Sequence, residues 1–369
     1  MDRTKWERKR IEEVCEKASS NIVLNKIEGN VGNYPLYGAS GYVKSVDFFH
    51  IERPYVGIVK DGAGVGRVGI YPARSSLVGT MQYIFPKKDC LLQYLSYGLQ
   101  SLHLDKHVSG ATIPHIYFKN YGKETIPFPP LPHQQAIVAE LDKLNEVIAL
   151  KRKQLADLDS LAQSLFYEMF GDPVVNEKGW IIKKLREIGM ITTGNTPSKA
   201  VPEYYNNSYV EWIKTDNIEQ DSPIATVAKE YLSEEGCKRG RVVDKGSLLV
   251  ACIAGSIESI GKSCITNRRV AFNQQINAVT PNESINVVFL YHLVRSMKKV
   301  IQDYATTGMK HILTKSAMEG ITIPLPPLPL QQSFAAKIAK IEAEKQRVKS
   351  SLKDLETLLA SRMQYWFDN

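Results

Sequence analysis

The chain contains one proline-rich phrase twice. Residues 126–145 read IPFPPLPHQQAIVAELDKLN, and residues 323–342 read IPLPPLPLQQSFAAKIAKIE. At an offset of 197 positions the two copies stay in register, without a gap, to the end of the chain. Identities continue well beyond the prolines, for example at Leu155 and Leu352. The match therefore indicates an internal duplication.

A long helix is predicted after each phrase. The prolines stiffen an extended lead-in and cannot continue a helix backwards. Apolar residues then recur at alternating steps of three and four, which is typical of a coiled-coil seam and predicts that the two helices pack on each other. The seam residues are Ile137, Leu141, Leu144, Ile148, Leu155, Leu158, Ala162 and Leu165, then Phe334, Ile338, Ile341, Val348, Leu352, Leu355, Leu359 and Met363, with polar interruptions at Lys151 and Lys345.

The segments that precede the two helices also echo each other, more faintly. The offset is 174 at Trp6 and Trp180, so the second segment is longer by about 23 residues of inserted loop. Short β-rich runs between Gly and Asn turns, with a helical stretch in each segment, predict an α+β fold. The expected architecture is two globular segments separated by two long antiparallel coiled-coil helices, with an approximate two-fold axis. The predicted division is 1–125, 126–172, 173–322 and 323–369.

Composition narrows the class of protein. The chain has 369 residues, of which 43% are hydrophobic and 23% charged, as in soluble globular proteins. No apolar run approaches the roughly 20 residues that cross a bilayer. The five cysteines fit no zinc module and are expected to be reduced and buried, as in a cytosolic protein. A net charge of +8 and a pI near 9.0 favour an anionic partner, most commonly nucleic acid.

These features resemble the specificity subunits of Type I restriction-modification systems, over essentially the whole chain. The repeated proline-rich phrases carry the resemblance most strongly. TTGNTPSK at 192–199, WIKTDNI at 212–218 and IGKSCITNRRVAFNQQINAV at 260–279 look like pieces of that family's target recognition domains. The first globular segment departs from this pattern, because EGNVGNYPLYGASG at 28–41 stands in place of a Gly-x-Thr-Pro phrase.

The resemblance implies a cytoplasmic, non-catalytic subunit that reads double-stranded DNA. Each globular segment would recognise one half of an interrupted, asymmetric site, and the helices would set the gap between the halves. The helices would also dock two adenine methyltransferase subunits, with or without a motor-nuclease subunit. No cofactor or metal is expected in this chain, since S-adenosylmethionine would be bound by the methyltransferase partner.

The residues suited to DNA contact fall in a few places. Arg268, Arg269, Asn273, Gln274 and Gln275 form the densest set of base-reading side chains, and we favour DNA contact for the arginines and a structural role for the amides. Lysines and arginines elsewhere suit phosphate contact, while the histidines either touch DNA or fix a turn. The predicted DNA-binding residues are Lys60, Arg67, Arg74, His115, Thr196, Lys199, Lys214, Arg268, Arg269, Lys310 and His311.

Other motifs have two interpretations. Gly64-x-Gly66-x-x-Gly69 matches a nucleotide-binding fingerprint, but the residues after it read as a strand, which favours a tight turn. The PPLP phrases are either ligands for an SH3-like domain or rigid joints, and their equivalent positions favour joints. His103 and His107 have metal-ligand spacing but lack a third ligand nearby. The glutamines of the phrases cap the helices or contact the partner subunit: Gln134, Gln135, Gln331 and Gln332.

Two rival functions stay open on the sequence. One is a self-contained DNA methyltransferase or nuclease of the bifunctional type, which would need a cofactor loop ahead of a helix and a catalytic cluster, neither of which is seen. The other is a coiled-coil scaffold that binds no DNA.

Overall fold

The computed structural model describes residues 6–110, 112–219, 222–306 and 308–368. The chain forms two compact units, which we call the first unit (residues 6–153 with 348–368) and the second unit (residues 154–347). Each unit thus contains one globular segment, the beginning of one long helix and the end of the other. The units therefore divide the chain within the helices, whereas the predicted division falls at the helix ends.

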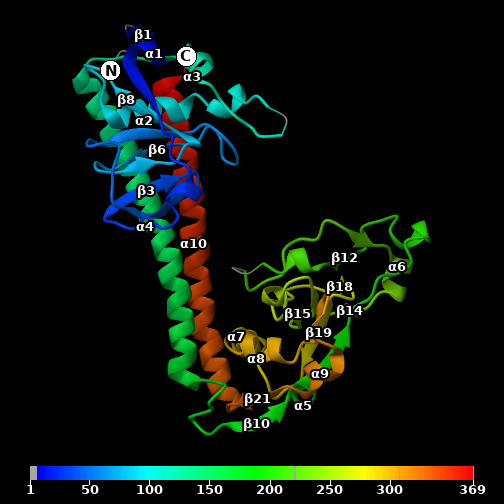
Figure 1. Ribbon diagram of the computed structural model, residues 1–369. Helices are drawn as coiled ribbons and strands as arrows, with labels where there is room; N and C mark the ends of the chain where they lie inside the picture. Colours follow the sequence, from blue (N-terminus) through cyan, green and yellow to red (C-terminus); the bar gives the residue numbers. More distant parts are fainter. Residues whose placement is uncertain (1–5, 111, 220–221, 307, 369) are drawn as a thin grey trace. The chain divides into compact units, whose positions relative to one another are not determined.

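The first unit is built on two sheets (Figure 1). Antiparallel strands in the order β2-β8-β5-β6 form one sheet, β4-β3-β7 form the other, and β1 pairs with β9 just before the long helix. Its strands are β1 (Arg8–Arg10), β2 (Cys15–Ser19), β3 (Tyr34–Gly38), β4 (Gly41–Val46), β5 (Tyr55–Val59), β6 (Val68–Tyr71), β7 (Ser76–Leu77), β8 (Met81–Pro86) and β9 (Thr125–Pro127). Its short helices are α1 (Ile11–Val14), α2 (Leu92–Ser101) and α3 (Phe118–Tyr121).

The second unit repeats this plan. Its sheets have the orders β11-β19-β15-β17 and β13-β12-β18-β14, β16 pairs with β20, and β10 pairs with β21 before the second long helix. Its strands are β10 (Ile181–Lys184), β11 (Gly189–Thr193), β12 (Val210–Ile213), β13 (Tyr231–Leu232), β14 (Val242–Val243), β15 (Leu248–Ala251), β16 (Ile253–Ala254), β17 (Ser263–Ile265), β18 (Val270–Phe272), β19 (Ile276–Pro281), β20 (His311–Ile312) and β21 (Thr322–Leu325). Its short helices are α5 (Leu185–Ile188), α6 (Glu234–Arg239), α7 (Val287–Ser296), α8 (Lys298–Asp303) and α9 (Lys315–Gly320).

The two units differ most between β12 and β15. A parallel pair occurs in both units, β3 with β7 and β12 with β18, so the strands before this point correspond. Strand β13 pairs with β12 as β4 pairs with β3, and the second unit then adds α6 and β14 before β15 begins. The extra residues predicted for the second segment therefore carry secondary structure and are not only loop.

The long helices are α4 (Leu131–Phe170) and α10 (Leu328–Phe367). Ion pairs join Arg152 to Glu356 in the first unit and Asp159 to Lys345 in the second, both at 2.7 Å. In the first unit Glu140 also pairs with Arg362, and in the second Lys337 Nζ lies 4.0 Å from Met169 Sδ, so within each unit the partner numbers on α10 fall as those on α4 rise and the helices are antiparallel. The predicted α+β class and antiparallel helix pairing are confirmed.

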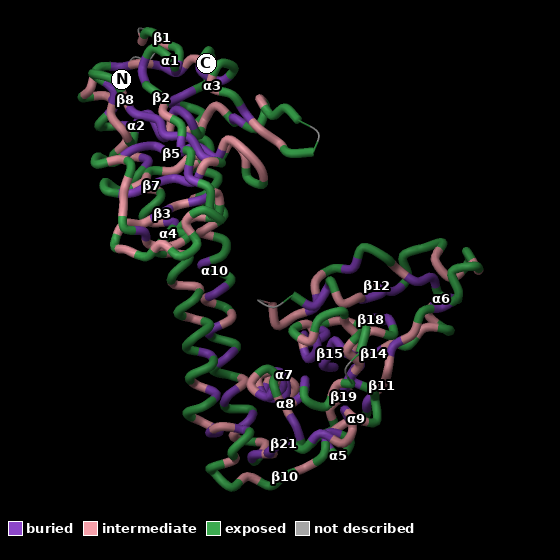
Figure 2. Tube along the Cα trace, viewed as in Figure 1, coloured by how far each residue is buried: buried purple, intermediate pink, exposed green. Residues whose placement is uncertain are grey.

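The predicted seam lies at the centre of these helix pairs. Ile137, Leu141 and Ile148 of α4 and Val348 of α10 are buried in the first unit. Figure 2 shows short buried stretches recurring between exposed ones along the long helices. One predicted interruption, Lys345, is also buried, with only 5% of the residue exposed. Its ammonium group is paired with both Asp159 and Glu342, at 2.7 and 2.9 Å, so the seam accommodates a charge because it is neutralised locally.

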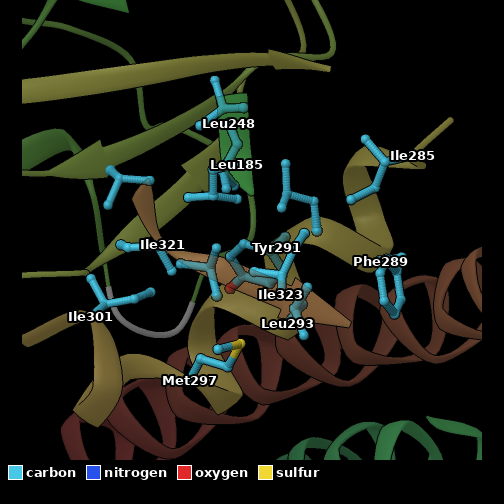
Figure 3. Close-up of a cluster of buried hydrophobic side chains, with 14 of the residues drawn as sticks. Leu185, Leu248, Ile285, Phe289, Tyr291, Leu293, Met297, Ile301, Ile321 and Ile323 are labelled. Carbon is cyan, nitrogen blue, oxygen red and sulfur yellow. The ribbon is translucent and has the colours of Figure 1, made fainter. Parts of the chain in front are cut away.

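Each globular segment shares its core with both helices. In the second unit, Phe289 of α7 packs among Phe166 and Phe170 of α4 and Phe334 of α10, with ring centroids 4.7–5.9 Å apart. Figure 3 shows Phe289 with neighbouring core side chains from α7, β21 and the sheet. In the first unit the same role falls to Trp366 and Phe367 at the end of α10. Burying these rings fixes each globular segment to its helix pair.

Two further predictions from composition concern the burial of the cysteines and membrane-spanning helices. Cys15, Cys90, Cys252 and Cys264 are free and buried, while Cys237 is half-buried. Burial raises the pKa of the Cys90 thiol to about 12, which keeps that thiol protonated and unreactive. Within the described ranges, no helix combines the length and apolarity needed to cross a bilayer.

Candidate nucleic-acid interface

The loop at 194–199 in the second unit organises the first group of candidate residues. Gly194 lies so close to Asn273 that a Cβ there would come within 2.1 Å of the Asn273 carbonyl oxygen, which explains the glycine. The side chain of Asn195 accepts from the backbone of Arg241 at 2.7 Å and donates to that of Arg239 at 2.8 Å. Thr196 Oγ1 donates to Gln274 Oε1. The loop therefore joins the residues after α6 to those that follow β18.

Two of the lysines predicted to bind DNA lie close to the ring of Trp212 on β12. The Nζ atoms of Lys214 and Lys199 lie 4.8 and 5.9 Å from its ring centroid, within cation–π range. Lys214 also pairs with Glu230, and this hydrogen bond holds the pKa of the Glu230 carboxyl below its ordinary value. Trp212 itself is 2% exposed, so it is a core residue, and the lysines carry the positive charge at the surface.

A groove of about 760 Å³ adjoins this position. Lys199, Tyr205, Lys229 and Tyr231 are among its lining residues. Basic side chains beside aromatic and amide groups suit contact with a nucleic-acid backbone and its bases.

The β16–β20 pair brings the last two predicted residues towards the same end of β18. The Gln275 carbonyl accepts from Cys252 at 2.8 Å, at the start of this pair. On β20, His311 lies opposite Ala254, and Lys310 is exposed just before it. The structure thus joins Thr196 to Gln274 and brings Lys199 and Lys214 together at Trp212, on the strand whose Ile213 carbonyl accepts from Asn273 N. Lys310 and His311 lie on the neighbouring strand pair, and we call Thr196, Gln274, these two lysines at Trp212, Lys310 and His311 the basic group around Gln274.

Arg268 and Arg269 lie at the other end of β18. Arg268 forms a bidentate ion pair with Glu211 of β12, at 2.5 and 2.6 Å, and donates at 3.0 Å to the carbonyl oxygens of Ala225 and Thr226. The pair lowers the pKa of Glu211 and raises that of Arg268, mainly through the mutual hydrogen bonds. DNA contact by Arg268 is therefore the wrong interpretation, because its guanidinium is committed to a structural pair.

The amide residues next to these arginines also separate into two roles. Asn273 is 6% exposed, and its side-chain oxygen accepts from Gln275 N at 3.1 Å, so its structural role is confirmed. Gln274 is exposed, and its side-chain oxygen accepts from Thr196 Oγ1, so its role stays a prediction. Arg269, 3.9 Å from Asp244 and 60% exposed at its side chain, stays a prediction.

In the first unit the candidates meet at the turn between β5 and β6. Ile116 N donates to Lys60 O at 2.9 Å, which places His115 beside Lys60. Lys60 pairs with Asp61, and Arg67 folds back towards the Gly64 carbonyl at 3.3 Å while remaining exposed. Because strand β6 follows this glycine-rich segment, the tight-turn interpretation is confirmed. Arg74 follows the far end of β6 and is not part of this group.

The two histidines occupy different positions in matching turns. Ser109 and His115 exchange backbone hydrogen bonds, and Thr306 and Ile312 do the same one repeat later. His115 therefore corresponds to Ile312 and not to His311. The Nδ1 atom of His311 is buried and has no hydrogen-bond partner among the described residues.

Two of the four candidate partner-binding glutamines are buried. Gln134 Oε1 accepts from Leu91 N at 2.9 Å, and its Nε2 donates to the carbonyls of Asp89 and Pro129 at 2.8 and 2.9 Å. Gln331 makes the matching bonds with Asn286 N, Ser284 and Pro326. Both residues are 0% exposed, so their side chains tie the globular segment to the helix start and cannot face a partner. Gln135 and Gln332 are exposed and stay predictions.

Sequence reasoning missed Arg239 and Arg241. They belong to the run CKRGR at 237–241, in which Arg239 ends α6 and Arg241 follows it, and both are exposed beside the 194–199 loop. Two arginines within this short basic run were the available signal. The metal interpretation gains no support, since no group of potential metal ligands occurs among the residues described, and His107 hydrogen-bonds Glu124 at 2.8 Å.

Comparison with known proteins identifies the family to which this architecture belongs. The sequence matches the family described as Type I restriction modification DNA specificity domain over residues 3–160 and 177–355. The chain belongs to this family. The two matched ranges each cover one globular segment and most of a long helix, as the duplication predicts.

Individual relatives and solved structures support the same family assignment. The chain is 24% identical over 291 residues to the EcoR124I/EcoR124II specificity subunit of Escherichia coli, covering 75% of this chain and 70% of that one. It is 21% identical to the MjaIX specificity subunit of Methanocaldococcus jannaschii, covering 89% and 85%. A Type I S subunit from M. genitalium has the same fold, with a TM-score of 0.62 at 14% identity over 99% and 96% of the two chains. The chain is thus a DNA specificity subunit, a non-catalytic class of protein.

Proposed function

We propose that this specificity subunit recognises an asymmetric, bipartite site in double-stranded DNA, one half with each globular segment. This proposal rests on the observation that one fold occurs twice in the chain with different side chains on its surface. The second unit presents Thr196, Gln274 and two arginines at the end of α6, Arg239 and Arg241. The described part of the first unit has no helix in the place of α6 and presents Lys60 and Arg67. Two unlike readers suit two unlike half-sites.

In the second unit we propose that DNA contacts the basic group around Gln274. Glutamine can bond the major-groove edge of adenine in bidentate fashion, while lysines and arginines neutralise phosphates. Gln274 bonds Thr196, Lys199 and Lys214 lie together at Trp212, and Lys310 and His311 lie at the β16–β20 pair. In the first unit the corresponding proposal rests on Lys60, Arg67 and His115, with Arg74 as a separate contact.

We propose that the subunit acts in the cytoplasm with two methyltransferase subunits, one for each repeat, with or without a motor-nuclease subunit. S-adenosylmethionine would be held by the methyltransferase. Segments 126–172 and 323–369 would act as spacers that set the unread gap, and the exposed Gln135 and Gln332 are candidate partner contacts. The duplication supports the count of two, since each repeat offers the same helix start.

The test is DNA binding by this chain in complex with its methyltransferase, together with methylome sequencing of cells with and without the gene. We expect one asymmetric bipartite motif to lose methylation when the gene is deleted, and we expect the affinity of the complex for that motif to fall steeply with salt. S-adenosylmethionine binding by the isolated chain would favour the self-contained enzyme. Salt-independent or absent DNA binding by the complex would favour a scaffold.

A further inference from the structure

The start of each long helix packs against the end of the other, and the residues at this contact differ between the units. In the first unit Glu140 of α4 meets Arg362 and Trp366 of α10. Arg362 Nε donates to Glu140 Oε1, while Arg362 Nη2 and Trp366 Nε1 each lie 3.1 Å from Oε2. The hydrogen bonds from Arg362 hold the pKa of the Glu140 carboxyl below its ordinary range. We call these residues the Glu140 triad.

The matching positions in the second unit carry different chemistry. At the offset of 197 they are Lys337, Leu165 and Met169. Lys337 Nζ lies 4.0 Å from Met169 Sδ, which corresponds to the contact between Glu140 and Trp366. The same two helical positions therefore touch in both units, and the acid, arginine and tryptophan are replaced by lysine, leucine and methionine.

If two copies of the chain paired their identical halves, α4 with α4 and α10 with α10, both contacts would be disrupted. The start of α4 against the end of a second α4 would place Glu140 opposite Leu165 and Met169, with its three hydrogen-bond donors gone. The start of α10 against the end of a second α10 would place Lys337 opposite Arg362, two like charges, and would leave Trp366 Nε1 without its acceptor. Opposed like charges and unpaired polar groups are the usual means of rejecting a wrong partner.

Another ion pair on these helices does not distinguish pairing of unlike halves from pairing of like halves. Arg152 pairs with Glu356, and the residues one repeat away are Lys349 and Asp159. In the second unit Asp159 pairs with Lys345 and not with Lys349, but a base and an acid occupy these two positions in every combination of halves. The triad therefore distinguishes unlike from like pairing, whereas this exposed ion pair does not.

We propose that the Glu140 triad makes each helix start selective for the end of the other helix, so that the partner this surface fits is the unlike half of the chain and not a second copy of the same half. The duplicated chain would thereby hold its two different readers together. This selectivity does not depend on DNA recognition, and its test needs no DNA.

Full-length variants can reproduce each wrong contact in place. Glu140→Lys sets a lysine opposite Arg362, as two α10 helices would. Arg362→Leu combined with Trp366→Met sets Glu140 opposite the residues that two α4 helices would present. We expect each variant to lower the melting temperature of the first unit by about 2–4 °C or more. Glu140→Lys combined with Arg362→Glu should recover most of the loss, because the pair is then restored in reverse.

Two controls define the outcome. Arg152→Ala removes the exposed ion pair that does not discriminate and should shift the melting temperature by about 1–2 °C at most. Glu140→Gln keeps the shape of the side chain and guards against a Glu140→Lys protein that fails to fold, and it should show a smaller loss in the same direction. A Glu140→Lys shift no larger than that of Arg152→Ala, or no recovery in the reversed pair, or a Glu140→Gln protein as stable as the parent, would each overturn the proposal.

Discussion

Arg268 and Gln274 illustrate how position along one short strand decides a residue's role. Both flank β18, six residues apart, which corresponds to about 20 Å along an extended chain. Arg268 reaches β12 and is neutralised by Glu211, while Gln274 emerges beside Thr196 and the lysines. The residue with the better base-reading chemistry is therefore structural, and its amide neighbour is the exposed candidate.

We expect Arg268→Ala to destabilise the second unit and leave DNA affinity per folded molecule unchanged. The change leaves Glu211, whose side chain is only 15% exposed, without its partner. Losing a partly buried pair of this kind should cost about 1–3 kcal/mol. Thermal unfolding measures the loss, and Arg269→Ala, at an exposed side chain, is the matched control. Equal stability of the two variants would contradict the structural role.

The same pair predicts an acid-sensitive contribution to stability. Arg268 holds the pKa of Glu211 below its ordinary 4.5 in the folded protein. A carboxyl with a depressed pKa stabilises the fold above its unfolded pKa and loses that contribution as pH falls through the folded value. The stability difference between the parent and Arg268→Ala should thus be full near neutrality and shrink below about pH 4.5. Denaturant unfolding across this range tests the sign, and a difference that grows with acid would contradict it.

Gln274 and Lys199 should separate base reading from phosphate contact. We expect Gln274→Ala to reduce discrimination at one base pair of one half-site by about 1–3 kcal/mol. Lys199→Ala should weaken binding to all sequences alike and lower the salt slope by about 0.9. Anisotropy titrations of the methyltransferase complex on single-base variants measure both effects. If Gln274→Ala weakened all sequences equally, the amide would not be a reader.

The prediction at the residue level failed where roles depend on distant partners. Glu211 precedes Arg268 by 57 residues, so nothing local in the arginine-rich run signals the ion pair. Asn273 was predicted correctly because a short amide between two strands commonly satisfies nearby backbone. Arg239 and Arg241 were missed because their position beside the 194–199 loop depends on Asn195, more than 40 residues earlier.

Among the elements, the joint between each globular segment and its long helix is the most predictable feature. Its structural role can be tested at one buried glutamine. Gln134 satisfies three backbone groups while fully buried. Gln134→Ala should lower the free energy of unfolding by about 2–4 kcal/mol, since buried polar groups lose their partners. The exposed neighbour Gln135→Ala should change it by less than about 0.5 kcal/mol. Chemical denaturation compares the two, and similar values would argue against the joint.

The long helices were predictable and the sheets were not, for a physical reason. Prolines before Leu131 and Leu328 and the recurring apolar residues are local signals that extend over forty positions. The strand pairs join distant segments, such as the parallel contact of Trp212 with Ala271. The short β-rich runs between turns predicted the α+β class but could not predict these registers, which depend on packing between segments.

At the scale of the whole molecule, the duplication predicts modular specificity. Replacing residues 174–322 with the equivalent piece of a relative should change only one half of the recognised DNA site. The reason is that the exposed basic group around Gln274 lies wholly inside that piece, while Lys60 and Arg67 lie outside it. Methylome sequencing of cells that carry the chimera reads out both halves at once. A change in both halves would show that the segments do not read independently.

Lengthening both helices should lengthen the unread gap. Seven residues added between Leu150 and Lys151 preserve the seam, because a heptad returns the apolar positions to the same face. The antiparallel contacts place the matching insertion between Thr357 and Leu358, since Arg152 pairs with Glu356 and both residues then stay on the same side of the inserted turns. The added length is about 10 Å at 1.5 Å per residue, or about three base pairs at 3.4 Å each. We expect the methylated motif to keep both half-sites and gain about three unread bases. An insertion in α4 alone would break the pairing and serves as the control, whereas an unchanged gap in the double insertion would show that the helices are not the spacer.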